Sequence, residues 1–138
     1  MIKRILFFLL AATLFGACSS SGKSTADTEK RVVFGNGGGF TGQYITYQLN
    51  SDGRVFTLLA DSSKQLLKKL RKKQTREIFT QADKIKKTRP AFSQPYNMTW
   101  FIRYYSGNEV AEYKWGDPEM PVADEIRDFY TQLNAIVK

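Results

Sequence analysis

The chain contains a single cysteine, Cys18, and no histidine. One thiol cannot form a disulfide within the chain, and structural zinc sites are built from several cysteine or histidine ligands. We therefore expect no metal site and no cofactor. The fold must be held together by side-chain packing, for which aromatic residues, 14% of the chain, are plentiful.

The segment before Cys18 has the pattern of a secretory signal. A basic pair is followed by an apolar run, residues 5–15, and then by the small residues Gly16 and Ala17. The run is shorter than the about 20 apolar residues that cross a bilayer. This segment resembles the lipobox signal of bacterial lipoproteins, although Phe15 stands where that pattern prefers Leu, Val or Ile.

The lipobox resemblance implies that residues 1–17 are removed and that Cys18 becomes an acylated N-terminus. Two or three acyl chains, palmitate among them, hold a protein firmly at a membrane. Ser19 follows the cysteine, which by the best-known sorting rule indicates the outer membrane of the cell envelope. The alternative is an ordinary signal peptide cut nearby, which would leave an unpaired thiol.

Residues 18–30 form the expected link between the lipid and the folded part. The stretch is small, polar and charged, and it cannot bury a core, so we expect a flexible tether. Residues 31–138 are the right length for one small domain.

Alternating patterns and turn signals predict several strands in this domain. Residues 50–53, Asn-Ser-Asp-Gly, are a hairpin signal, and residues 106–108 form a second turn. The stretch 62–73 is ambiguous: it fits an edge strand with outward lysines, which we prefer, or the start of one continuous helix from residue 62. The expected strands cover residues 31–34, 44–49, 55–60, 65–70, 98–105 and 110–115.

Apolar residues at helical spacing predict two helices. One covers residues 73–87, with Thr75 as its N-cap, and the other runs from Pro121, at its first position, to the end of the chain. Residues 88–97, with two prolines, are expected to be a loop. The order β-β-β-(β)-α-β-β-α predicts an α+β fold, a mainly antiparallel sheet with two helices packed on one face.

The glycine-rich string, residues 34–42, is the most unusual feature of the domain. Glycine permits positive φ and close backbone approach, so the string is either a wide turn or bulge, an anion cradle, or a mobile loop that offers Phe40 to a partner. A nucleotide phosphate loop is excluded because no lysine follows and a strand comes next. The candidate partner-binding residues are Gly37, Gly38, Gly39, Phe40 and Thr41.

This string, together with the tyrosine-rich strand after it, the lysine-rich stretch before Ile78-Phe79 and the segment Tyr113-Lys114-Trp115-Gly116, resembles a group of small, uncharacterised bacterial lipoproteins. The similarity spans most of residues 32–137. The resemblance favours a strand at residues 65–70. It implies no known activity and no known functional residues.

Positive charge is concentrated in one stretch. Residues 64–89 hold eleven basic residues against two acidic ones. The stretch is either a solvated face that keeps the domain soluble or a contact for an anionic surface such as lipid phosphates. Nucleic acid is not expected as a partner, because the envelope is the wrong compartment. The candidate contacts are Lys68, Lys69, Arg71, Lys72 and Lys73.

No catalytic residues are expected. The usual triads lack their base, since there is no histidine. Glu109 and Glu112 fall on opposite faces of a strand and cannot act as a pair. Trp100 and Trp115, with the tyrosines of the same hairpin, are expected in the core; on an open sheet face they would form a stacking surface for sugars or peptides.

The sequence therefore predicts a lipid-anchored envelope protein with a non-catalytic domain that binds a protein or a cell-envelope glycan. The alternative is a periplasmic enzyme inhibitor that acts through the loop around Phe40. An enzyme that uses carboxylates or lysine is the third hypothesis.

Overall fold

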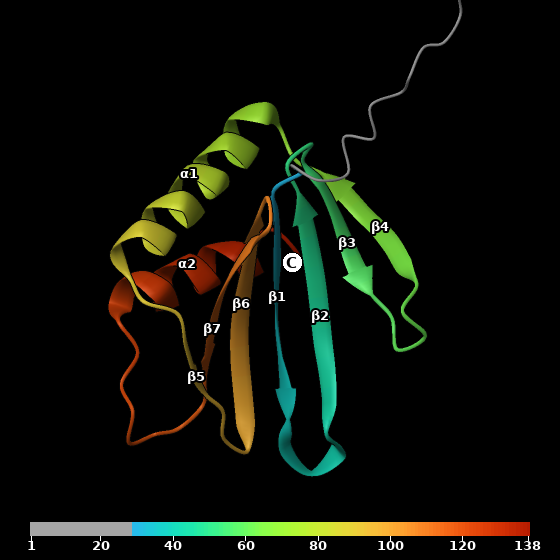
Figure 1. Cartoon of the computed structure of the whole chain (residues 1–138). Helices are drawn as coiled ribbons and strands as arrows, with labels where there is room; N and C mark the ends of the chain where they lie inside the picture. The colour runs from blue at the N-terminus through green and yellow to red at the C-terminus, as the bar shows by residue number, and fades with distance from the viewer. Residues whose placement is uncertain (1–28) are drawn as a thin grey trace, which may run out of the picture.

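Seven strands form one sheet, and both helices lie against the same face of it (Figure 1). The computed structural model describes residues 29–138; Cys18, the predicted signal and nearly all of the predicted tether lie outside the described residues. The strands are β1 (Arg31–Gly38), β2 (Gln43–Asn50), β3 (Arg54–Leu58), β4 (Lys64–Lys69), β5 (Phe92–Gln94), β6 (Met98–Ser106) and β7 (Glu109–Trp115), the helices are α1 (Lys72–Thr88) and α2 (Asp124–Ala135), and a 3-10 turn, η2 (Gly39–Thr41), joins β1 to β2.

The strand order in the sheet is β4-β3-β2-β1-β6-β7-β5. All neighbours are antiparallel except β5 and β7, which run parallel. The predicted α+β fold, with a mainly antiparallel sheet and two helices on one face, is confirmed. Between residues 29 and 138, no helix is long and apolar enough to cross a membrane.

The β2–β3 turn forms where the Asp-Gly signal predicts it. Gly53 has φ +88°, a conformation that glycine adopts without steric cost. The Asp52 carboxylate accepts a hydrogen bond from the Arg54 backbone N–H at 3.0 Å, which closes the turn.

The predicted strand at residues 65–70 is confirmed as β4, and the competing continuous helix from residue 62 is wrong. β4 is the edge of the sheet, and all six of its residues are exposed. Its lysines are typical of edge strands that avoid pairing with another chain.

Both predicted helices are present, but their starts differ from the prediction. The N-cap of α1 is Arg71, so Thr75 lies one turn inside; its buried hydroxyl donates to the Arg71 carbonyl at 3.1 Å. α2 begins at Asp124 rather than at Pro121. The acidic residues of its first turn, Asp124 and Glu125, favour that start because they complement the helix dipole.

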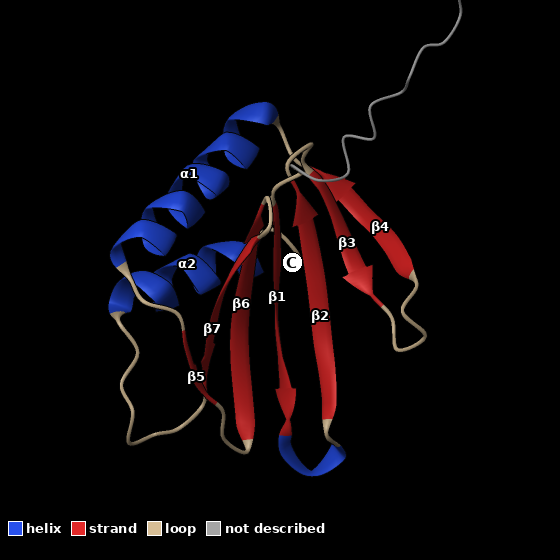
Figure 2. Ribbon diagram, in the orientation of Figure 1, coloured by secondary structure: helices blue, strands red, loops and turns tan. Residues whose placement is uncertain are grey.

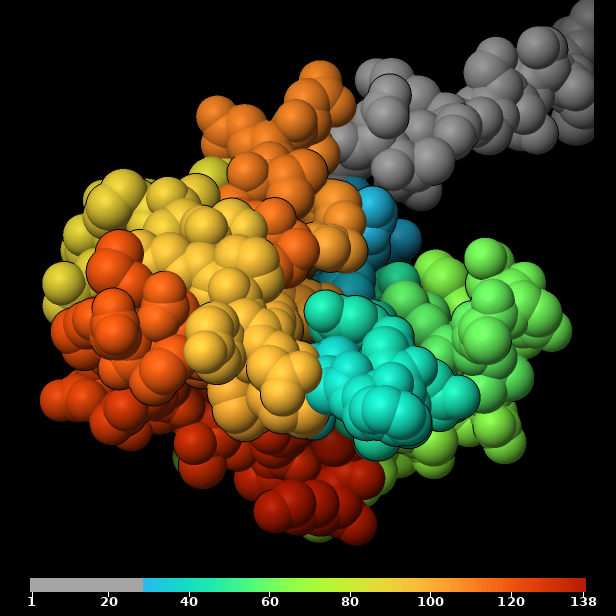
Figure 3. All heavy atoms as spheres, turned by 90° about the horizontal axis from the view of Figure 1, so that it is seen from below, coloured from blue at the N-terminus to red at the C-terminus, as the bar shows by residue number. Residues whose placement is uncertain are grey.

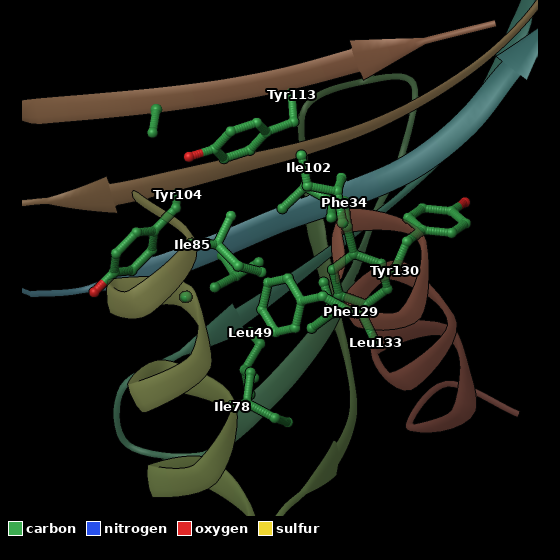
Figure 4. Packing of buried hydrophobic residues seen from close by; sticks show 14 of the residues in the cluster. Phe34, Leu49, Ile78, Ile85, Ile102, Tyr104, Tyr113, Phe129, Tyr130 and Leu133 are labelled. Carbon is green, nitrogen blue, oxygen red and sulfur yellow. The ribbon is translucent and has the colours of Figure 1, made fainter. Parts of the chain in front are cut away.

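The core lies between the helices and the sheet (Figure 4). A large apolar side chain stabilises a fold by about 1.5–3 kcal/mol when it is fully buried. The expected core position of the second hairpin's aromatics is confirmed: Tyr104, Tyr113 and Trp115 are buried, and half-buried Trp100 packs against the same cluster. The cluster also contains Phe34, Leu49 and Ile102 from the sheet, Ile78 and Ile85 from α1, and Phe129, Tyr130 and Leu133 from α2.

Two segments are more regular than predicted (Figure 2). Residues 92–94, expected in a loop, form β5 beside β7. β1 continues through the glycine-rich string to Gly38 instead of ending at Phe34. At Gly35 a Cβ atom would collide with the carbonyl oxygen of Ile45 on β2, so the close approach of the two strands requires glycine there.

Candidate functional site

The candidate partner-binding residues fall at the end of the β1–β2 hairpin. Gly37 and Gly38 are the last residues of β1, and Gly39–Thr41 form the turn η2. Gly38, Gly39 and Gly42 have positive φ, which L-residues rarely adopt. This sharp reversal leaves the Phe40 side chain fully exposed, at 108% of its reference area.

The turn is held against the loop between β5 and β6. The Gly39 backbone N–H donates to the Asn97 carbonyl at 2.6 Å. The same loop is fixed from inside the protein, because the buried Thr99 hydroxyl donates to the Tyr96 carbonyl at 2.9 Å. The position of Phe40 is therefore set by hydrogen bonds as well as by the glycines.

Four further exposed apolar side chains lie on the segments next to the turn that carries Phe40. β1 pairs with β2 on one side and β6 on the other, which brings the turn and the loop before β6 together (Figure 3). The two uncharged stretches that supply this surface are residues 32–51 and 90–102. We call this end of the sheet the hairpin end and define it as Phe40, Tyr44, Ile45, Tyr96 and Met98, all of them exposed. Tyr44 and Ile45 are consecutive residues of β2, so they expose opposite faces of the sheet at this end.

The glycine N–H groups do not form an anion cradle. Gly35 and Gly37 lie in β1 between two paired strands, so their backbone groups face neighbouring strands. The Gly39 N–H donates to the Asn97 carbonyl and the Gly42 N–H to the Gly39 carbonyl, so these donors do not converge on one point. A Cβ atom at Gly37 would lie 2.6 Å from the Tyr44 Cγ atom, because the Tyr44 side chain lies across this glycine. The Tyr44 ring also packs on Phe101, with ring centroids 6.2 Å apart.

The candidate anionic-surface residues lie at the opposite end of the sheet. Lys68 and Lys69 end β4, Arg71 precedes α1, and Lys72 and Lys73 begin it. All five are exposed. In Figure 1 this end is at the top, where β1 begins, and the hairpin end is at the bottom.

A hollow of about 670 Å³ lies between α2 and the loop that follows β7. Trp100 and Trp115 line it from the sheet, and Tyr130 lines it from α2. The Tyr130 hydroxyl donates to Asn36 Oδ1 at 3.3 Å, and burial raises the pKa of this tyrosine. Arg127 and Asp128 add charges at the rim, so this hollow differs in character from the uncharged hairpin end.

The carboxylates considered for catalysis are engaged in ion pairs. Burial of Glu112 favours its neutral form, but the hydrogen bond from Arg103, at 2.6 Å, and the positive charges of Arg103 and Lys114 together outweigh it and hold the pKa of this carboxyl below its usual value. Glu109 pairs with Lys86 of α1, which lowers its pKa as well. Glu109 and Glu112 lie on opposite faces of β7, as predicted.

Asp117 and Glu119 flank Pro118 in the loop that follows β7. The Asp117 carboxylate accepts a hydrogen bond from the Glu119 backbone N–H at 3.0 Å, so it closes a local turn. Among residues 29–138, no group of three or more His, Cys, Asp or Glu could hold a metal ion.

No protein family and no curated protein matches the sequence. Functional assignment therefore depends on the geometry of the two ends of the sheet and of the hollow.

Sequence reasoning identified Phe40 but missed the rest of the hairpin end. Tyr96 and Met98 are 56 and 58 positions further along the chain and reach Phe40 only through the β1–β6 register, in which Gly38 pairs with Met98. The signal that could have found them is the absence of charge in residues 90–102, which matches the uncharged stretch around Phe40.

Proposed function

We propose that this protein is a lipid-anchored envelope protein, held in the outer membrane through Cys18, whose domain is a non-catalytic binding module. Its partner is a second envelope protein with a concave apolar pocket, and the hairpin end is the surface that enters this pocket. The observation that carries the proposal is the full exposure of Phe40 on a turn that a backbone hydrogen bond fixes in place.

The composition of the hairpin end favours a protein partner. Aromatic residues and methionine are enriched in the centres of protein interfaces, and charged residues are depleted there. The hairpin end has three aromatic side chains, one methionine and no charge. A monomeric protein rarely leaves such side chains together in water without a use for them.

A glycan partner is less well supported by the same geometry. Stacking on sugars uses exposed aromatic faces with polar groups around them. The aromatics of the second hairpin belong to the core cluster or pack against it. Trp100 and Trp115 line the hollow, but Trp100 is half-buried there and Trp115 is buried, so neither presents an open ring face.

The enzyme-inhibitor function is the second candidate, and the convex shape of the turn favours it. A single protruding aromatic side chain on a fixed loop is suited to insertion into an enzyme cleft. Both candidates use Phe40, and they differ in whether the captured partner is an enzyme that loses activity when it is bound.

A photocrosslinking amino acid placed at residue 40 of the full chain in living cells tests the proposal. The matched control is residue 110, since Val110 is also an exposed apolar residue but lies at the other end of the sheet, on β7. We expect one discrete adduct from residue 40 and none from residue 110. The captured protein, once purified, should bind the chain and lose about tenfold or more in affinity when F40A is introduced, as for a central interface anchor. Equal adducts at both positions, or unchanged affinity with F40A, would contradict the proposal.

A further inference from the structure

The described chain begins within the positively charged end of the molecule. The Lys30 carbonyl accepts a hydrogen bond from the Ser51 backbone N–H at 3.0 Å, next to the β2–β3 turn. That turn is bonded to the start of α1, because the Leu70 N–H donates to the Gly53 carbonyl at 2.8 Å. We call this surface the basic end and define it as Lys68, Lys69, Arg71, Lys72, Lys73 and Arg76, all of them exposed.

None of the six side chains of the basic end forms an ion pair within the described part of the chain, although Asp52, which pairs with Arg54, lies beside Lys69. No carboxylate of residues 29–138 lies within ion-pair distance of any of the six. Several basic residues elsewhere are paired, such as Lys84 with Glu125 and Arg103 with Glu112. The basic end therefore groups six positive side chains that are free of ion pairs within the described part of the chain, and it is suited to bind anions.

The start of α1 adds to the positive field. A helix N-terminus carries a partial positive charge and favours acidic residues in its first turn. α1 has none there and instead begins with Lys72 and Lys73, without a side-chain cap. A hollow of about 500 Å³ beside it is lined by four basic residues and one carboxylate, Asp52, which pairs with Arg54. The basic residues are Lys30, Lys69, Lys72 and Arg76, and Ser51, Thr75 and Phe79 complete the lining.

We propose that the basic end docks on anionic phospholipid headgroups of the membrane that holds the protein's own lipid. This inference rests on the proposed lipid anchor at Cys18. The chain makes twelve Cα-to-Cα steps from Cys18 to Lys30 and can span at most about 40 Å, so the anchored domain stays within reach of the headgroups. A polybasic surface next to an acyl anchor is a known second signal for membrane attachment, and the anchor makes the local concentration of headgroups high.

The docking fixes the orientation of the binding module. β1 runs from the basic end to the hairpin end, and its eight residues cover about 25 Å. With the basic end on the headgroups, the uncharged hairpin end points away from the membrane (Figure 1). Phe40 is then presented to proteins in the aqueous compartment rather than to the lipid.

Amine footprinting of the full lipidated chain on vesicles tests this orientation. The vesicles are phosphatidylcholine alone or an equimolar mixture with phosphatidylglycerol, and the reactivity of each lysine is read by mass spectrometry. On the anionic vesicles we expect the reactivity of Lys68, Lys69, Lys72 and Lys73 to fall about threefold or more, since each lysine near such a surface is attracted to it. Exposed Lys87, near the other end of α1, serves as the internal control and should not change. High salt should restore the reactivity, because at 1 M the electrostatic range shrinks to about 3 Å.

Two variants of α1 give a matched comparison. K72Q/K73Q removes two charges at the start of the helix, and K84Q/K87Q removes two from its last five residues. We expect the first variant to lose the protection of Lys68 and Lys69 and the second to keep it.

The outcomes separate the two proposals. A chain that floats with both kinds of vesicle while its lysines react equally on both overturns the docking and leaves the anchor intact. A chain that does not float at all overturns the anchor and the docking together. Protection by inorganic phosphate without vesicles would show a site for free phosphate and would also overturn the docking.

Discussion

The Lys30 ammonium lies 2.7 Å from Asp83 Oδ2, and the Tyr104 hydroxyl donates to the other oxygen of the same carboxylate, also at 2.7 Å. These contacts join the first described residues to α1 and to β6. They fix the position where the chain enters the domain, beside the basic end. The proposed orientation, in which the chain enters the domain beside the membrane-facing basic end, therefore depends on the Asp83 carboxylate.

Acid should weaken this connection, and the pKa of Asp83 gives the direction. Burial favours the neutral carboxyl, but the hydrogen bonds from Lys30 and Tyr104 outweigh it and lower the pKa below its usual value. A lowered folded-state pKa means that the contribution to stability is complete above about pH 4 and is lost as the pH falls through the lower folded value. D83N should cost about 1 kcal/mol at neutral pH, since the pair is partly exposed, and should show less acid dependence. Urea unfolding of the wild-type chain and of D83N at several pH values measures the free energy of unfolding of each. The control is D128N, at an exposed aspartate of α2. If D128N lowers the free energy of unfolding and its acid dependence as much as D83N does, the role given to Asp83 is wrong.

The glycines of the hairpin should differ in their tolerance of a methyl group. G37A places a Cβ atom 2.5 Å from the Tyr44 Cα atom, so strand pairing must shift, at a cost of about 2 kcal/mol. At Gly42 the Cβ atom would meet open space, and G42A should cost about 1 kcal/mol through its positive φ alone. Denaturant unfolding compares the two, and an equal cost would indicate that the β1–β2 approach is not as close as described.

Loss of the Phe40 ring should leave the fold unchanged. The side chain is fully exposed, so F40A should alter the free energy of unfolding by less than about 0.5 kcal/mol. Partner binding should nevertheless fall, as argued above. The control is V110A, which removes an exposed apolar side chain from the other end of the sheet. A large loss of stability with F40A would mean that the ring packs on the protein, and the binding proposal would lose its basis.

The basic start of α1 should reduce stability. K72Q/K73Q removes positive charge from the positive end of the helix dipole and should raise the free energy of unfolding by about 0.5 kcal/mol. K84Q/K87Q should lower it, because charges near the helix C-terminus are favourable and Lys84 pairs with Glu125 at 3.4 Å. Urea unfolding at low ionic strength shows the sign of each effect. Stabilisation by the second pair, or destabilisation by the first, would contradict this reading of α1.

The sequence predicted those elements whose signals are local. The Asp-Gly turn and the apolar stripes of both helices are short-range patterns, and the structure contains all three. β5 was missed because Pro90 and Pro95 indicate a loop, whereas its pairing with β7 is a long-range contact. The end of β1 was misplaced because glycine is usually depleted in strands; here the close approach of β2 requires it.

The candidate site was predictable only in part, for the same reason. Phe40 is conspicuous among glycines, but its neighbours Tyr96 and Met98 depend on strand register across the sheet. Likewise, the lysine-rich stretch is visible in the sequence, while its position beside Lys30 depends on how β4 and α1 pack around the β2–β3 turn.

The most direct test of the account is intact-mass and N-terminal peptide analysis of the protein isolated from cell membranes. The account predicts a mature chain that begins at Cys18 with a diacylglyceryl group on sulfur and an acyl group on nitrogen, and a C18S variant that lacks the lipid and leaves the membrane. A mature chain that begins elsewhere, or a C18S variant that remains on the membrane with unchanged processing, would contradict it.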